Sequence, residues 1–171
     1  MKALIAALSF SLVTFAAPSL AQEQPMRYAD AAEVAKDVGG EYFAAYIARD
    51  WDSIEPLMAD ENSFHDDSAA LVFGSVEYLG KENVLRGFRE GYAGITHMKF
   101  TSLREMHAGH FAIFEGSLDW GVNVGGGRVV NSEMPFVVIL RIENGKVTEH
   151  RDYADYSPFI AAMQSQENGA D

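Results

Sequence analysis

The spacing of apolar residues changes once along the chain, from a helical repeat to an alternating one. Between residues 31 and 46, apolar side chains recur at steps of three and four, which predicts an amphipathic helix. Asp30 stands where an N-cap is expected, with Glu33 three places on as in a capping box. Gly39 and Gly40 interrupt the pattern, so we expect them to weaken or kink this helix.

Shorter patterns complete the N-terminal half. Helical spacing recurs over residues 51–58 and again over 81–92, while polar residues flanking Phe64 predict a short strand over 61–67. Residues 68–79 lack a sustained period and predict a loop.

After residue 94 the period becomes two, which predicts long β-strands. They cover approximately residues 96–106, 110–123, 128–143 and 146–156. Asn144-Gly145 is the strongest hairpin signal in the chain. Gly125-Gly126-Gly127 predicts another turn, because no helical pattern with Lys-Ser/Thr follows it, as a phosphate-binding loop requires.

Helices that precede a run of antiparallel strands are typical of α+β proteins. We therefore predict a cone-shaped, curved antiparallel or mixed sheet, with the three N-terminal helices covering one face. A short last helix is expected near residues 159–164. Such a cone encloses a cavity suited to a small, mostly apolar molecule.

The first 21 residues have the features of a secretory signal peptide. Lys2 is their only charge, an apolar stretch follows, and Ser19 and Ala21 are small residues before an expected cut after Ala21. The stretch is shorter than the ~20 apolar residues of a membrane span, the alternative interpretation. We therefore expect a secreted or periplasmic protein without a membrane anchor after processing. The mature chain is expected to have a flexible leader over residues 22–28, one domain over 29–166 and a disordered tail over 167–171.

Composition excludes several classes of function. Against 13 basic side chains the chain has 25 acidic ones, a net charge of −12, which disfavours nucleic acids and anionic membranes as partners. The absence of cysteine excludes disulfide scaffolds, thiol nucleophiles and cysteine-ligated metals.

Several short strings, in order, resemble the nuclear transport factor 2-like superfamily in its SnoaL-like and ketosteroid isomerase-like branch. They are DWDSI at 50–54, LMADE at 57–61, FHD at 64–66, GKENV at 80–84, NGKV at 144–147 and HRDYAD at 150–155. The resemblance covers residues 31–156 and implies a cystatin-like roll. It does not fix the chemistry, because this fold carries isomerases, dehydratases, hydrolases, cyclases and plain binding modules.

Resemblance to ketosteroid isomerases implies a base at Asp66 and an oxyanion-stabilising hydroxyl at Tyr42. Burial in an apolar cone raises a carboxylate's pKa, so Asp66 could shuttle a proton between carbons. The oxyanion hole of those enzymes also uses a protonated aspartate, and the matching position in this chain is Val138. Steroid isomerisation itself is therefore not expected, and Asp66 could instead cap a turn.

Resemblance to limonene epoxide hydrolase-like proteins implies a second pair of acids, Asp152 and Asp119. Ser117 replaces the arginine that would bridge them, which argues against the epoxide hydrolase relay in that form. Two facing carboxylates without a cation would share a proton and could still act in acid–base catalysis. Asp152 could alternatively pair with a nearby histidine or arginine.

Among the histidines, His150 is the first candidate for ligand binding, because it shares a strand face with Asp152 that the resemblance directs into the cone. His97 is the second. Neither a His-x-His nor a His-Glu-x-x-His spacing occurs, so we expect no metal, and the resemblance implies no cofactor.

Apolar strand positions are expected to line the cavity, among them Phe100, Phe136 and Val138. Residues 136–140 are apolar at every position, so this strand must be covered on both faces, which predicts a homodimer. Two functions remain open: a cofactor-free acid–base enzyme that acts on a small apolar carbonyl, alkene or epoxide, and a secreted ligand-binding or dimerisation module of the same shape.

Overall fold

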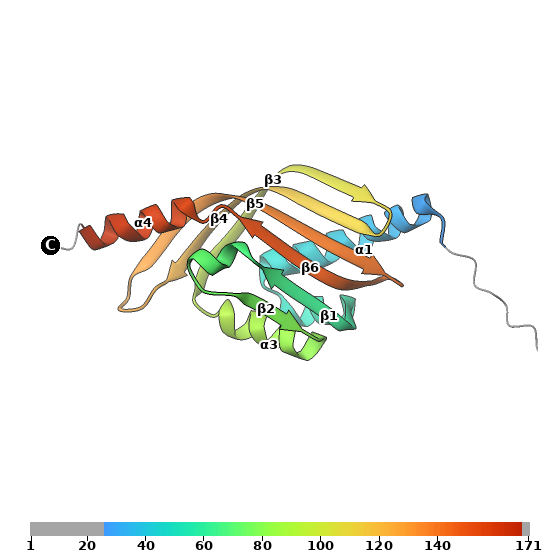
Figure 1. Cartoon of the computed structure of the whole chain (residues 1–171), viewed down its shortest axis with the longest axis horizontal. Helices are drawn as coiled ribbons and strands as arrows, with labels where there is room; N and C mark the ends of the chain where they lie inside the picture. Colours follow the sequence, from blue (N-terminus) through green and yellow to red (C-terminus); the bar gives the residue numbers. More distant parts are fainter. Residues whose placement is uncertain (1–25, 169–171) are drawn as a thin grey trace, which may run out of the picture.

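The computed structural model describes residues 26–168, which form a six-stranded sheet with helices packed against it (Figure 1). The helices are α1 (Tyr28–Ala48), α2 (Trp51–Ile54), α3 (Lys81–Gly91) and α4 (Ser157–Asn168), with 3-10 turns η1 (Glu55–Leu57) and η2 (Ser68–Leu71). The strands are β1 (Met58–Asp66), β2 (Val76–Leu79), β3 (Ile95–Ala108), β4 (Phe111–Asn123), β5 (Val129–Glu143) and β6 (Lys146–Ala154). The expected signal peptide lies outside the described residues.

The strand order is β2-β1-β6-β5-β4-β3, and every neighbouring pair is antiparallel except β1 and β6. The predicted α+β class is thus confirmed, with a mixed, curved and open sheet. In Figure 1, α3 lies under β1 and β2 while α1 crosses behind the longer strands. Register irregularities in β3, between Ile95 and His97 and between Ser102 and Arg104, are bulges of the kind that bend a strand.

Helix α1 is continuous where a kink was expected. Gly39 packs so closely on β4 that an added Cβ would lie 2.5 Å from the Ala112 Cβ, whereas one at Gly40 would meet nothing within 4 Å. The expected Asp30 cap is also wrong. The helix starts earlier, at Tyr28, and Asp30 lies in its first turn, where it pairs with Arg27 at 2.7 Å.

Two boundaries in the middle of the chain differ from the prediction. The helix expected over residues 51–58 shortens to α2 and a 3-10 turn containing Pro56, which has no N–H for a helical bond. Within the expected loop, β2 pairs with β1 from Ser63 opposite Leu79 to Asp66 opposite Val76. This short strand is formed by its pairing with β1, because its own sequence has no alternation of polar and apolar residues long enough to predict it.

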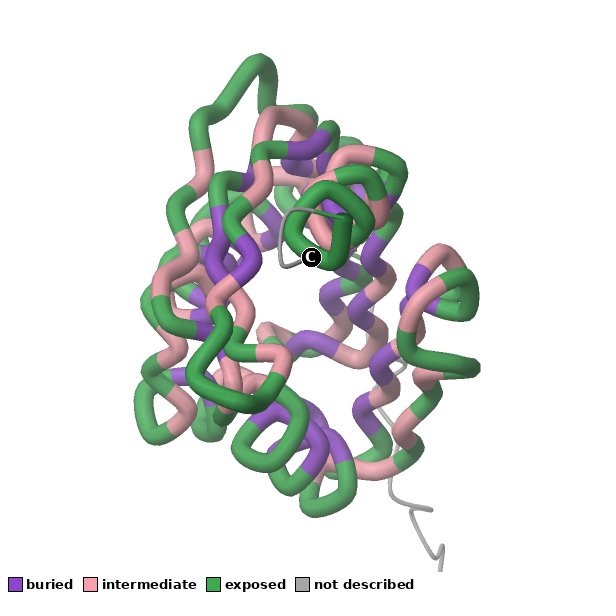
Figure 2. Tube along the Cα trace, turned by 90° about the vertical axis from the view of Figure 1, so that its left-hand side faces the viewer, coloured by how far each residue is buried: buried purple, intermediate pink, exposed green. Residues whose placement is uncertain are grey.

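The core lies between the sheet and the helices, where Figure 2 shows the buried segments gathered. Phe159 at the start of α4 is fully buried, and this helix continues to Asn168, so residues 167 and 168 are helical rather than part of a tail. None of the described helices is both long enough and apolar enough to cross a membrane.

Candidate functional site

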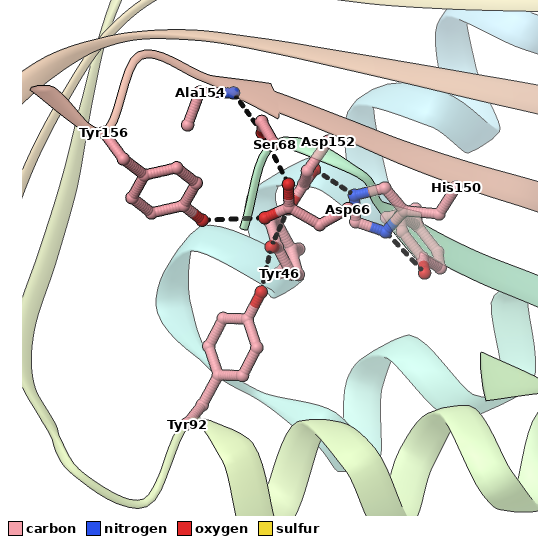
Figure 3. Close-up of polar contacts among 9 residues, drawn as sticks. Tyr46, Asp66, Ser68, Tyr92, His150, Asp152, Ala154 and Tyr156 are labelled. Atoms are coloured by element: carbon pink, nitrogen blue, oxygen red, sulfur yellow. Dashed lines mark hydrogen bonds and ion pairs between the residues drawn. The ribbon is translucent and has the colours of Figure 1, made fainter. Parts of the chain in front are cut away.

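Asp66 ends β1 with its side chain turned inward, since alternate residues of this strand are buried. Its Oδ1 accepts hydrogen bonds from Ser68 Oγ at 2.5 Å and from the Ala69 amide at 2.9 Å, both in the following 3-10 turn. The Tyr156 hydroxyl, just beyond β6, donates to Oδ2 at 2.7 Å. The turn and the end of β6 thus hold the carboxylate from two sides (Figure 3).

Burial, followed by the charge of nearby Asp152, raises the pKa of Asp66 above its usual range, and hydrogen bonds from Ser68, Tyr156 and Ala69 offset only part of this rise. A carboxylate offers about four lone-pair directions. Three are filled, which leaves one on Oδ2 for a ligand or a proton.

A second buried carboxylate, Asp152, lies on β6 with His150 on the same face. His150 Nε2 lies 2.7 Å from Asp152 Oδ1, and the Tyr42 hydroxyl of α1 lies 3.2 Å from His150 Nδ1. Because an ionised carboxylate only accepts, the network assigns the imidazole proton to Nε2, and Tyr42 then donates to Nδ1.

Tyr46, one helical turn after Tyr42, donates its hydroxyl proton to Asp152 Oδ2 at 2.5 Å. The Tyr46 hydroxyl is also hydrogen-bonded to that of Tyr92, which follows α3. Burial first, and the Asp152 charge next, raise the pKa of Tyr42, Tyr46 and Tyr92 well above the ordinary value, so all three remain protonated.

A cavity of about 280 Å³ opens beside Asp66. Its walls are mostly apolar and aromatic: Phe64, Asp66, Ala69, Phe73, Ser75, Val76, Tyr78, Gly87, Gly91, Tyr92, Ile95, Trp120, Val122 and Tyr156. Asp66, Tyr92 and Tyr156 therefore reach the cavity. Tyr42, Tyr46, His150 and Asp152 are not among the lining residues, and the hydrogen bond between Tyr46 and Tyr92 connects their group to the cavity wall.

Asp66 and Asp152 are both buried, and the charge of Asp152 raises the pKa of Asp66, but their hydrogen bonds go to different partners. Tyr42 does not lie where the resemblance implied. It is fully buried and bonded to His150, and it is not among the residues that line the cavity. Tyr92 and Tyr156 bring hydroxyls to the cavity instead. His150 likewise contacts Asp152 rather than the cavity, which matches the alternative that Asp152 pairs with a nearby histidine.

The expected facing pair of Asp119 and Asp152 does not form. Asp119 lies on the outward face of β4, exposed, with His97 Nε2 of β3 at 3.1 Å. Asp152 lies on the inward face of β6. Because side chains alternate between the two faces of a sheet, Asp119 and Asp152 point to opposite faces. Asp119 and its partner His97 therefore lie outside this site.

The apolar candidates Phe100, Phe136 and Val138 pack in the core rather than around the cavity. The Phe100 ring lies 4.9 Å from that of Phe43 and 6.3 Å from that of Phe136. Val138 is opposite Asp152 in the sheet. Helix α1 covers this part of the sheet, which keeps these side chains from the cavity.

Sequence reasoning missed Tyr46, Tyr92, Tyr156 and Ser68. A signal existed for Tyr46, because tyrosines four residues apart share a helix face. Tyr92 and Tyr156 are the last residues of the helix and strand expected over 81–92 and 146–156. In the structure both stand just past these elements, where the period no longer shows which way a side chain points. Over residues 26–168, no three His, Cys, Asp or Glu side chains come together as they would to hold a metal ion.

Comparison with known proteins identifies the family and supports the fold. The family model described as SnoaL-like domain matches residues 40–150. Among curated proteins, no sequence match is found.

Several solved structures share the fold at low sequence identity. A candidate SnoaL-like polyketide cyclase from Shewanella denitrificans is 17% identical, with a TM-score of 0.68 over 77% of this chain and 98% of its own. A protein with a ketosteroid isomerase-like fold from Catenulispora acidiphila, in complex with trimethylamine, is 18% identical, with a TM-score of 0.58 over 74% of this chain and 91% of its own. An LEH-like epoxide hydrolase from M. tuberculosis is 14% identical with a TM-score of 0.59 over 78% and 91%.

Proposed function

The chain belongs to the SnoaL-like domain family, whose fold includes cofactor-free isomerases, cyclases and epoxide hydrolases, and on this premise we propose that it binds a small, largely apolar molecule beside Asp66 and that Asp66 is a general base. One observation carries the proposal: a buried carboxylate with a raised pKa keeps a free lone pair at the wall of an apolar cavity.

The proposed step is proton transfer at carbon. Asp66 Oδ2 takes a proton from a carbon beside a carbonyl, the electron pair of that C–H bond moves onto the carbonyl oxygen, and the proton returns to the same or another carbon. As Asp66 becomes neutral, it holds the Tyr156 proton less strongly. Tyr156 can then donate to the oxyanion that forms.

Deuterium exchange tests this step without knowledge of the natural substrate. With cyclohex-2-enone in D2O, NMR measures exchange of the protons beside the carbonyl, and we expect the wild-type protein to accelerate it. Asp66→Asn should lower the rate by about 100-fold, the scale of general acid–base catalysis. The matched control is Asp67→Asn, because Asp67 is adjacent but exposed. Equal exchange by wild type and Asp66→Asn would overturn the base assignment.

A non-catalytic binding module is the second candidate. It is favoured by the bonds to Ser68 and Ala69, which are those of an aspartate that holds a turn. Binding of small molecules without exchange would support it.

Export and dimerisation complete the proposal. We propose that the signal peptide is removed in a secreted or periplasmic protein, and N-terminal sequencing of exported protein should begin at Gln22 rather than Met1. The proposed homodimer uses the outward face of the sheet, where Ile113, Val137 and Ile139 are only partly buried.

A further inference from the structure

The cavity is walled by aromatic rings that meet at steep angles. The Phe73 ring centroid lies 6.3 Å from that of Trp120 and 6.0 Å from that of Tyr156, with interplanar angles of 89° and 82°. Phe64, Tyr78 and Tyr92 line other parts of the cavity. Aromatic faces carry the negative part of the ring quadrupole, and a corner of steeply inclined rings turns such faces in more than one direction.

The hydroxyl protons of the cavity tyrosines are directed away from a ligand. Tyr156 donates to Asp66. Tyr46 has a single proton, which it donates to Asp152, so its oxygen must accept the proton of Tyr92. With both carboxylates ionised, Tyr92 and Tyr156 therefore offer the cavity oxygen lone pairs and ring surface, not donors.

No positive side chain balances this negative character at the cavity wall. Asp66 receives its hydrogen bonds from two hydroxyls and one backbone amide, all neutral, and the described lining contains no Lys, Arg or His. The Arg49 guanidinium donates to the Ile95 carbonyl from outside the lining. Buried charges in proteins are usually paired, so a charge partner for Asp66 is missing among the lining residues.

We propose that the cavity binds a compact organic cation, with an alkylated ammonium group held by Asp66 and by the rings of Phe73, Trp120 and Tyr156. Such a group suits this site because its surface is hydrocarbon while its charge is diffuse, and aromatic cages recognise quaternary ammonium ions in this way. The inference rests on the proposed function only in taking this cavity as the ligand site.

Choline and its neutral carbon isostere, 3,3-dimethylbutan-1-ol, test the charge requirement at constant shape. Titration calorimetry on the wild-type protein should show choline binding at least about tenfold more tightly, the scale of a desolvated cation–aromatic contact with a carboxylate. This comparison needs no variant, so it does not depend on whether a substituted chain folds. Equal or tighter binding of the alcohol, or binding of neither probe, would overturn the proposal.

Variants then locate the site. Asp66→Asn and Trp120→Leu should each weaken choline binding by about tenfold or more while changing alcohol binding by only about threefold or less. Asp119→Asn is the matched control, since it removes one negative charge from the outward face. Choline binding that falls equally in Asp119→Asn and Asp66→Asn would mean a general charge effect and would count against the cavity.

The two proposals fail in different ways. If cyclohex-2-enone exchange depends on Asp66 but choline binds no better than its isostere, the general-base proposal is supported and the cation-site proposal is overturned. If choline binds selectively through Asp66 and Trp120 without any exchange, the cation-site proposal is supported. The general-base proposal is then overturned in favour of a non-catalytic binding module.

Discussion

At the scale of single residues, the raised pKa of Asp66 links the site to stability. The carboxyl group titrates at about 3.9 in an unfolded chain, and burial together with the Asp152 charge moves its folded pKa upward. Between these two values the folded state binds more protons, so the contribution of Asp66 to stability is complete below the unfolded pKa and is lost as pH rises through the folded one.

Asp66→Asn should therefore stabilise the protein more at high pH than at low pH. The amide keeps an oxygen for Ser68 and Ala69 and carries no charge to desolvate. Thermal unfolding at pH 4, 6 and 8 should show the melting temperature of the variant rising relative to wild type along the series, with no such trend in exposed Asp67→Asn. A difference that shrinks with pH would contradict burial as the dominant cause.

At the scale of elements, Gly39 sets how closely α1 packs on the sheet. Gly39→Ala should lower the free energy of unfolding by about 1–3 kcal/mol, because the new methyl group overlaps Ala112. Gly40→Ala meets nothing and should raise it by up to about 1 kcal/mol through helix propensity. Urea unfolding measures the free energy of unfolding of both variants. Equal changes in the two variants would contradict the prediction, because they would mean that α1 shifts freely over β4.

The elements that the sequence predicted best are those whose hydrophobic repeat continues over many residues and those joined by a short local turn. The hairpin at Asn144-Gly145 lies between β5 and β6, and Asn144 has a φ of 51° as this turn requires. Strand β2 was missed because its four residues are too short to show a period and are fixed by pairing with β1. The Asp66–Tyr156 bond was missed because its partners are 90 residues apart in sequence. For the same reason Asp119 was misplaced, since only the register shows which face of β4 it occupies.

At the scale of the whole molecule, the outward sheet face predicts assembly. Ile139 of β5 is opposite Ile113 of β4, and both are half-buried there. In a dimer built on this face, Ile139→Lys would bury an unpaired charge and should give a monomer in sedimentation. Ala44→Lys makes the same change on the exposed side of α1 and should leave the sedimentation unchanged. A wild-type monomer, or a dimer in Ile139→Lys, would contradict the prediction.

The parallel pairing of β1 with β6 also has a kinetic consequence. Asp66 and Tyr156 are 90 residues apart in sequence, and the strands that carry the site are joined only after all the intervening elements have been made. Closing so long a loop costs entropy before any contact forms, which slows folding. The helices and the β3–β5 meander can form from nearer contacts, but the cavity assembles only when the last strand docks. A nascent chain therefore has no complete site until Tyr156 has been synthesised and has reached Asp66.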